Sequence, residues 1–139
     1  MADVLTPKQR SRCMSAISYK DTAPELLLRS MLRSVPFRYS VNDPSLPGKP
    51  DIVFKRRKKA IFVHGCFWHR HNCRAGRSVP STRTRFWTDK LKENKSRDKR
   101  QISKLRRMGW RVMVVWQCQL RGPKARRVLA RVARFLGPL

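Results

Sequence analysis

The stretch Ile52-Val53-Phe54-Lys55-Arg56-Arg57-Lys58-Lys59-Ala60-Ile61-Phe62-Val63 contains two short apolar runs on either side of a basic turn. Short runs rich in β-branched and aromatic residues, separated by a few polar ones, are typical of two strands joined as a hairpin. We therefore expect residues 52–54 and 60–63 to form paired antiparallel strands, with the rest of the chain arranged about them.

A third apolar run, Arg111–Trp116, is the strongest strand candidate in the sequence. Its apolar residues do not alternate with polar ones, which is typical of a strand buried on both faces. We predict that it lies at the centre of the sheet. A weaker alternation over residues 37–41 predicts a further strand, and three prolines and a glycine within residues 42–50 predict a loop.

Helices are predicted at about residues 6–18, from residue 22, at residues 88–108 and at residues 123–136. Thr22 and Glu25 fit a capping box at the start of the second helix. Residues 66–80 show no helical or strand period and are predicted to be a loop. The resulting order, α-α-β-β-β-loop-α-β-α, indicates an α/β chain built as a three-layer or α+β sheet domain.

The chain has 139 residues, which suits a single domain spanning residues 1–139. Its 34 Lys and Arg stand against 8 Asp and Glu, so the formal net charge is +26. Such an excess repels itself unless it meets a polyanion. Anionic membranes and acidic proteins are alternative partners, but we favour nucleic acid, because releasing counterions from phosphates rewards this charge directly.

Nothing in the sequence resembles a signal peptide or a membrane span, so we expect a cytoplasmic protein without a membrane partner. In that compartment the four cysteines are better interpreted as thiols or metal ligands than as disulfides. One of them, Cys13, lies on an apolar helical stripe, where we expect it to pack in the core.

All three histidines and two of the four cysteines fall between His64 and Cys73. Thiolate and imidazole ligands in a tetrahedral set select zinc, and a closed set of four is structural. We predict a zinc site formed by Cys66, His71, Cys73 and Cys118. The alternative is reduced thiols beside exposed histidines, and from the residues alone His64 or His69 could also be the fourth ligand.

The few acidic residues are candidates for catalysis. Asp51 is expected at the start of a strand, facing His64 across the hairpin, and is either a metal ligand or an ordinary strand-end residue. Glu25 is either the capping-box residue or an outer-shell metal group. For Asp98 the default is a surface ion pair.

His69 could act as a general base, because its ordinary pKa lies near neutrality, and His64 could contact a phosphoryl oxygen.

Aromatic residues lie beside cationic ones at two places. Phe67 and Trp68 belong to the Cys/His loop, and Trp87 follows Arg83 and Arg85. Aromatic side chains in such settings stack on bases or wedge into an opened base step. For these three aromatics core packing is an equally good interpretation. For Trp110 and Trp116 it is the better one.

These motifs together resemble the very short patch repair DNA mismatch endonucleases. The resemblance centres on Ile61-Phe62-Val63-His64-Gly65-Cys66-Phe67-Trp68-His69, followed by His71 and Cys73. It extends over nearly the whole chain in order. Further matching segments are Arg10-Ser11, Met14, Ala16-Ile17, Asp21-Thr22, Glu25, Ser45-Leu46-Pro47-Gly48, Pro50-Asp51, Pro80, Thr82-Arg83-Thr84, Phe86-Trp87, Arg97-Asp98, Gly109-Trp110-Arg111-Val112, Val115-Trp116 and Cys118.

The resemblance implies a fold related to restriction endonucleases, with a mixed central sheet flanked by helices and a structural zinc site. It implies an Mg²⁺-dependent enzyme that nicks double-stranded DNA on the 5′ side of the thymine in a T:G mismatch, which arises by deamination of 5-methylcytosine. Such an enzyme would act as a monomer, associated with the bacterial nucleoid through DNA and working with other mismatch-repair proteins.

Carried over by position, the resemblance also implies a role for each candidate residue. Asp51 and the main-chain carbonyl of Val63 would hold Mg²⁺, and Glu25 would hold a metal-bound water. His69 would be the general base, supported by Asp98, and His64 would assist at the phosphate. The zinc ligands would be Cys66, His71, Cys73 and Cys118. DNA would be contacted by Phe67, Trp68, Trp87, Arg83, Arg85 and Met14.

In this scheme residues 1–20 form a DNA-contacting helix and residues 123–139 a basic C-terminal helix. Two other functions are compatible with the same residues. One is a nuclease with broader mismatch specificity or a restriction-type target. The other is a zinc-containing DNA-binding module without catalytic activity, which would not need Asp51, His64 and His69 to converge.

Overall fold

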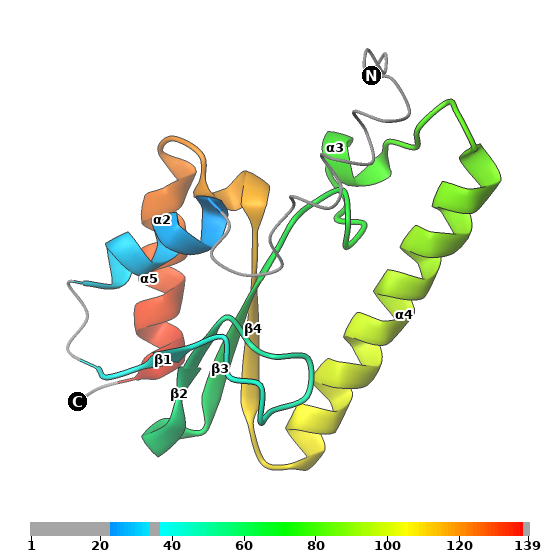
Figure 1. The fold of residues 1–139 in the computed structure, drawn as a ribbon. Coiled ribbons are helices and arrows are strands. Elements are labelled where there is room, and N and C mark those ends of the chain that lie inside the picture. Colours follow the sequence, from blue (N-terminus) through cyan, green and yellow to red (C-terminus); the bar gives the residue numbers. More distant parts are fainter. Residues whose placement is uncertain (1–22, 34–36, 138–139) are drawn as a thin grey trace.

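The computed structural model describes residues 23–33 and 37–137 (Figure 1). Their strands form one sheet in the order β1 (Ser40–Val41), β2 (Ile52–Phe54), β3 (Lys59–His64) and β4 (Arg111–Trp116). The first three strands pair antiparallel, and β4 pairs parallel to β3. The predicted hairpin is therefore confirmed, with a short 3-10 turn at Lys55–Arg57 joining its strands.

The predicted central position of β4 is wrong, since β4 is the outermost strand at one end of the described sheet. Only Met113 and Val115 are buried on it; Val112, Val114 and Trp116 are half-buried, and Arg111 is exposed. Helices cover both faces of this edge strand, so the run is apolar throughout without having a strand on each side. The parallel neighbour, β3, is the more deeply buried of the pair.

Helices lie on both faces of the sheet, which confirms the three-layer interpretation of the sequence. Figure 1 shows α2 (Ala23–Leu32) and α5 (Lys124–Leu136) on one side and α4 (Thr84–Arg107) on the other. One apolar core joins α2 and α5 to the sheet, and it includes Leu28, Leu32, Ile52, Phe54, Ile61, Val63, Met113, Val115, Leu120, Val128, Val132 and Leu136. None of the helices in the described part is long and apolar enough to cross a membrane.

Three boundaries differ from the sequence prediction. Helix α4 begins at Thr84, earlier than residue 88, because Phe86 and Trp87 pack against other aromatic rings and the helix extends to hold them. A short helix, α3 (Arg74–Arg77), interrupts the predicted loop at residues 66–80. Of residues 37–41, only the last two pair as a strand. The helix predicted at residues 6–18, with Cys13 and Met14, and the Thr22 cap lie outside the described residues.

Two cations from the hairpin hold the end of α5. Arg57 donates to the carbonyl of Leu136 at 2.8 Å, and Lys59 donates to the carbonyls of Phe135 and Leu136 at 2.5 and 3.1 Å. The last carbonyls of a helix lack partners within it and carry partial negative charge, so cations stabilise this end. The basic turn of the hairpin thus fixes α5 against the sheet.

Ile61 tests the central place of β3, because its side chain has no exposed surface in the main core. Replacing Ile61→Ala should lower the free energy of unfolding by about 2–5 kcal/mol, since a cavity remains in the core. Urea denaturation followed by circular dichroism measures this change. The control Val79→Ala, at a side chain that is 40% exposed, should shift stability by less than about 0.5 kcal/mol. Equal effects of the two substitutions would contradict this packing.

Candidate active site and metal centre

The site forms where β3 and β4 end side by side. Their register pairs His64 with Trp116, so the residues that follow each strand leave the sheet at the same point. The loop after β3 then folds back on itself. His69 donates its backbone N–H to the carbonyl of Gly65 at 3.1 Å, and His71 donates to that of Cys66 at 3.0 Å. This folding turns successive histidines of one short loop toward different neighbours.

Cys66, His71, Cys73 and Cys118 come together as predicted from the sequence. Their potential ligand atoms all lie within 4.8 Å of one another. The Cys118 sulfur lies 3.4 Å from Nδ1 of His71, and the Cys118 N–H donates to the Cys66 sulfur at 3.4 Å. Three sulfurs and one imidazole in such a group suit zinc in a closed, structural site. Neither His64 nor His69 belongs to this group, so its geometry favours Cys118 as the fourth candidate ligand over the two histidines that the sequence left open.

The pKa values of the Cys66 and Cys73 thiols are shifted in opposite directions. Burial raises the pKa of the Cys66 thiol to about 12, whereas a hydrogen bond from the Gly76 backbone N–H lowers that of Cys73 to about 6. A buried thiol of this kind becomes a good ligand only when a cation stabilises its thiolate. A metal bound to this donor set would therefore ionise the Cys66 thiol.

Two residues that support this group were not identified as site residues from the sequence. Trp116 was expected to be a core residue, but its ring stacks on His71 at 4.3 Å between centroids and contacts His64 edge-on at 5.2 Å. Gly76 lies against the backbone of His71, where an added Cβ would come within 1.8 Å of the His71 carbonyl oxygen. The available signal was a Gly placed three residues after Cys73, the last candidate ligand of the loop.

A second group contains His64, His69 and Asp98, whose potential ligand atoms also lie within 4.8 Å of one another. Nδ1 of His69 lies 2.5 Å from Oδ2 of Asp98, which α4 carries to the loop. The side chain of Asp98 is only 12% exposed, so this contact is not the surface ion pair taken as the default from sequence. A carboxylate on Nδ1 fixes the ring and leaves Nε2 available to accept a proton.

His64 is buried and stacks parallel to His69, with ring centroids 3.9 Å apart. Burial, and then the neighbouring His69, lower the pKa of His64 to about 4. His64 is therefore neutral at physiological pH, which makes it a hydrogen-bonding group rather than a cation. The stacking covers one face of the His69 ring and restricts the ring's orientation.

Asp51 and Glu25 form a buried carboxylate pair at the same end of the sheet. Asp51 does not face His64 as predicted: the register pairs Ile52 with Ile61, and Asp51 accepts a 2.6 Å hydrogen bond from the Val63 N–H. Burial raises the pKa of Asp51 to about 8, and the adjacent Glu25 adds to this rise. Glu25 is 3% exposed and is paired with Arg29 at 3.4 Å. Two buried carboxyls in contact are costly unless they share a proton or a cation.

The two candidate centres are adjacent through β3. Val63 donates to Asp51, and the next residue, His64, stacks on His69. The predicted catalytic residues thus converge on the last two residues of one strand. The arrangement brings buried carboxylate oxygens close to a histidine held by a carboxylate, and metal-assisted hydrolysis uses groups of these two kinds.

The aromatic residues form one cluster beside this site. Phe67 and Trp68 are in contact at 5.2 Å between ring centroids, and Trp87 lies 5.8 Å from each of them. Phe86 extends the cluster to an exposed position, and Arg83 lies 4.4 Å above its ring. The three predicted aromatics are half-buried, so their contact with one another does not prevent contact with DNA. Arg85 is exposed on the first turn of α4.

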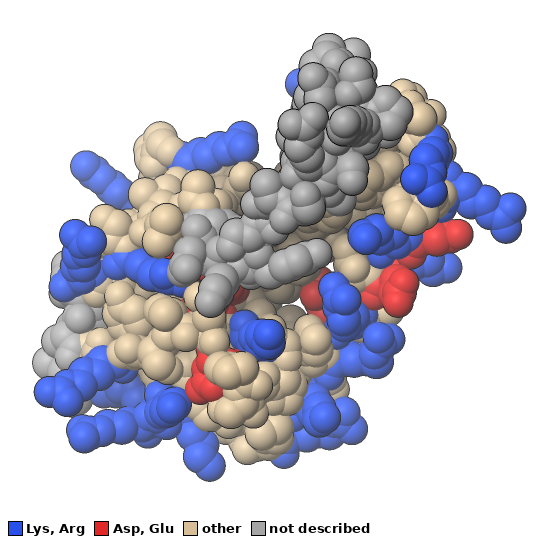
Figure 2. Space-filling view, in the orientation of Figure 1, with Lys and Arg blue, Asp and Glu red and all other residues tan. Residues whose placement is uncertain are grey.

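Cations surround these groups. On the face drawn in Figure 2, Lys and Arg lie along much of the periphery, and Asp and Glu form only a few small patches. The acidic groups that are described thus stand out as local features of a basic surface.

Comparisons with known proteins agree on one family. Residues 2–75 match the family model described as DNA mismatch endonuclease Vsr. The chain is 49% identical over 122 residues to the DNA mismatch endonuclease Vsr of Escherichia coli strain K12, covering 88% of this chain and 78% of that protein. It is 46% identical over 120 residues to the type II nicking enzyme V.XorIIP of Xanthomonas oryzae, covering 86% of this chain and 88% of that protein. A third relative, the type II nicking enzyme V.NmeAIP of Neisseria meningitidis, is 42% identical over 121 residues, which cover 87% of this chain and 86% of that protein.

Gly76→Ala tests whether the turn at α3 positions the metal ligands. The added methyl group would overlap the His71 backbone, so the loop must shift and the four ligands must separate. We expect the purified variant to bind much less zinc than the unchanged protein, as measured by elemental analysis. Ala75→Ser, at the exposed neighbouring position, is the control and should bind zinc normally. Full zinc content in the Gly76 variant would show that this close contact does not constrain the site.

Proposed function

Because the chain belongs to the DNA mismatch endonuclease Vsr family, we propose that it nicks double-stranded DNA on the 5′ side of the thymine in a T:G mismatch. The observation that carries the proposal is the convergence of the His69–Asp98 pair and the Asp51–Glu25 pair on the end of β3. A DNA-binding module without catalytic activity would not need this convergence, so the geometry favours an enzyme.

The proposed cofactor is Mg²⁺, which would be held by Asp51 and the main-chain carbonyl of Val63, with Glu25 holding a water bound to it. The buried Asp51–Glu25 pair fits a hard cation, because oxygen ligands suit Mg²⁺ and because positive charge relieves the repulsion between the two carboxylates. When bound, Mg²⁺ would stabilise the negative charge that develops on the phosphate during hydrolysis.

The protein's own groups would handle the proton. Nε2 of His69 would accept a proton from the attacking water, while Asp98 keeps Nδ1 protonated and stabilises the imidazolium that forms. Neutral His64 would donate a hydrogen bond to a phosphoryl oxygen. The expected products are a 5′-phosphate and a 3′-hydroxyl.

Zinc at Cys66, His71, Cys73 and Cys118 would be structural. It would tie the loop after β3 to the segment after β4, and in this way hold His69 in place between the first two ligands of the loop. The mixed sheet with helices on both faces is compatible with the restriction-endonuclease-like fold that we propose for the whole of residues 1–139.

Recognition of the mismatch would depend on the aromatic cluster. Phe67, Trp68 and Trp87 would wedge into the duplex beside the T:G pair, with Arg83 and Arg85 on the backbone and Met14 in the minor groove. A mispaired step costs less to open than a matched one, by up to a few kcal/mol, which supplies the selectivity. We propose that the protein works as a monomer on DNA in the bacterial cytoplasm, alongside other mismatch-repair proteins.

End-labelled duplexes that differ only in T:G or T:A at one position test the substrate. With Mg²⁺, the T:G duplex should be nicked 5′ of the thymine, and the T:A duplex and EDTA samples should stay intact. Equal cleavage of T:A would support a restriction-type nuclease, and cleavage of several mismatches a broader repair enzyme. A lack of cleavage under every condition would support a non-catalytic module.

Substitution of the two proposed catalytic centres tests the mechanism. Asp51→Asn and His69→Ala should each slow nicking of the T:G duplex by about 100-fold or more, the range for losing a metal ligand or a general base, while still binding it. Single-turnover nicking and a gel-shift assay measure the two properties. Asp89→Asn, at an exposed position on α4, is the matched control and should nick at the unchanged rate. Near-normal nicking by either catalytic variant would refute its assignment.

The metal content tests the zinc site directly. Purified protein should contain about one zinc per chain, and Cys66→Ser or Cys118→Ser should lose most of it, because a tetrahedral site with three ligands binds zinc weakly. Cys13→Ser removes the cysteine outside the group and should leave the zinc content unchanged. If Cys66→Ser retains its zinc, the ligand set is wrong.

The raised pKa of Asp51 predicts how Mg²⁺ and protons compete. The carboxyl must lose its proton to bind the metal, and its pKa is about 8. Between pH 6 and 7, the Mg²⁺ concentration for half-maximal nicking should therefore fall by about tenfold. Titrating Mg²⁺ at each pH separates this midpoint from changes in the maximal rate. A midpoint independent of pH would mean that Asp51 is already ionised before the metal binds.

A further inference from the structure

A stripe of arginines runs along the outer surface of α5. Arg127, Arg131 and Arg134 are exposed and have the i, i+4, i+7 spacing that places residues on one face of a helix. We call these three residues the α5 stripe. The apolar residues Val128 and Val132 are buried on the other side of the helix. The core therefore fixes the direction in which the stripe points.

The C-terminal part of the sequence, which includes the stripe, contains no acidic residue. Residues 99–139 include 12 Lys and Arg but not one Asp or Glu. Exposed Ala130 and Ala133 lie among the arginines, so an extended polyanion could approach the helix closely. Arg131 is also held in place, since it donates to the side chain of Gln119 at 3.3 Å.

The stripe continues into a shallow groove at the free edge of β4. Arg131 and Arg134 line this groove together with Val112, Met113, Val114 and Phe135. The exposed large apolar side chains among the described residues lie elsewhere, and α5 carries none of them. A protein partner, even an acidic one, usually binds through large, mainly apolar side chains at the centre of the interface. A surface that offers arginines on a helix without such anchors better suits a phosphate backbone, which gains from charge alone.

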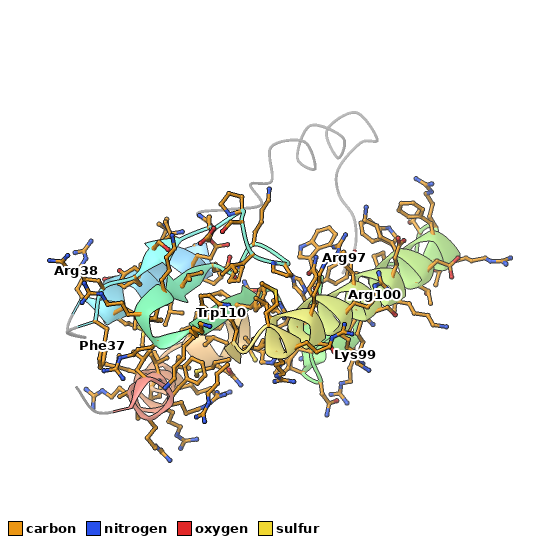
Figure 3. All side chains as sticks on the ribbon, turned by 90° about the horizontal axis from the view of Figure 1, so that it is seen from below. Phe37, Arg38, Arg97, Lys99, Arg100 and Trp110 are labelled. Atoms are coloured by element: carbon orange, nitrogen blue, oxygen red, sulfur yellow. The ribbon has the colours of Figure 1, made fainter. Side chains whose placement is uncertain are left out.

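The stripe lies away from the proposed catalytic centre. Asp98 and its partner His69 are on the side of α4, whereas α5 packs on the opposite face of the sheet (Figure 1). Figure 3 draws α5 at the lower left and α4, with Arg97 and Arg100, at the right. The sheet stands between the two helices, so a duplex held at the aromatic cluster and His69 would not also lie on α5.

We propose that the α5 stripe is a second DNA-binding surface, which holds the backbone of another duplex segment without sequence preference while the first occupies the catalytic site. Helix α5 has 13 residues and is about 20 Å long, a length over which a duplex presents on the order of ten phosphate charges. One chain would then bridge two DNA segments and pass between them without dissociating. The proposal concerns binding alone and does not depend on which mismatch is cut.

The test is the number of short duplexes that one chain binds. Sedimentation velocity with fluorescent, fully matched duplexes in EDTA and low salt should show two duplexes per protein chain. The triple variant Arg127→Gln, Arg131→Gln, Arg134→Gln should bind one. Its nicking of a T:G duplex should be unchanged, because the stripe is outside the catalytic centre. The log–log salt dependence of binding the second duplex to the unchanged protein should have a slope of about −3, close to one for each arginine of the stripe.

A matched control removes the same charge from another helix. Lys92→Gln, Arg100→Gln, Arg107→Gln changes three exposed cations of α4 and should still bind two duplexes. The charge-preserving variant Arg127→Lys, Arg131→Lys, Arg134→Lys should also bind two, which separates loss of charge from a disturbed helix.

Three results would overturn the proposal. One duplex per unchanged chain would show that no second surface exists. Equal loss in the α4 control would show that net charge, not the stripe, is responsible. If the α5 variant lost nicking in proportion to its loss of binding, the stripe would contact the same duplex that the catalytic site cuts. Absence of nicking by every protein, with two duplexes still bound, would count against the proposed function only.

Discussion

The parallel pairing of β3 with β4 is the constraint on which the site depends. Its last rung joins His64 to Trp116, so that the chain leaves both strands at one point. Cys66 and Cys118, 52 residues apart in sequence, meet two residues beyond that rung. The same pairing needs a long crossover, which α4 supplies, and this helix carries Asp98 back to His69. One register thus determines both the metal group and the histidine–carboxylate pair.

Burial favours the neutral form of two ionisable side chains near the end of β3, Asp51 and His64. It raises the pKa of Asp51 and lowers that of His64, so both groups tend to be neutral when no ligand is present. Asp98, by contrast, provides a carboxylate partner for His69. Perturbed pairs such as Asp51 and Glu25 are characteristic of functional sites. Asp51, Glu25 and His64 all lie within residues 2–75, the segment that matches the family model, which favours the functional interpretation.

Much of this arrangement could be predicted from the sequence, because short-range patterns carry it. The hairpin, the strand at Arg111–Trp116 and the grouping of the four candidate metal ligands followed from apolar runs and ligand types. The edge position of β4 did not, because helices on both faces produce the same apolar run as neighbouring strands would. The contact of Asp98 with His69 was implied only by the family resemblance. The bond of Asp51 to Val63 and the contact of Trp116 with two histidines depend on distances between remote segments, which local patterns do not contain.

The central claim is that one loop holds His69 as a base whose Nδ1 is protonated toward Asp98 and whose Nε2 is free. Long-range ¹H–¹⁵N correlation spectra of the zinc-loaded protein, labelled at histidine, distinguish the two tautomers directly. We predict the Nδ1–H tautomer for neutral His69, and a mixture of tautomers in the Asp98→Asn variant. An Nε2–H tautomer in the unchanged protein would contradict the account, because the nitrogen meant to accept the proton would already carry one.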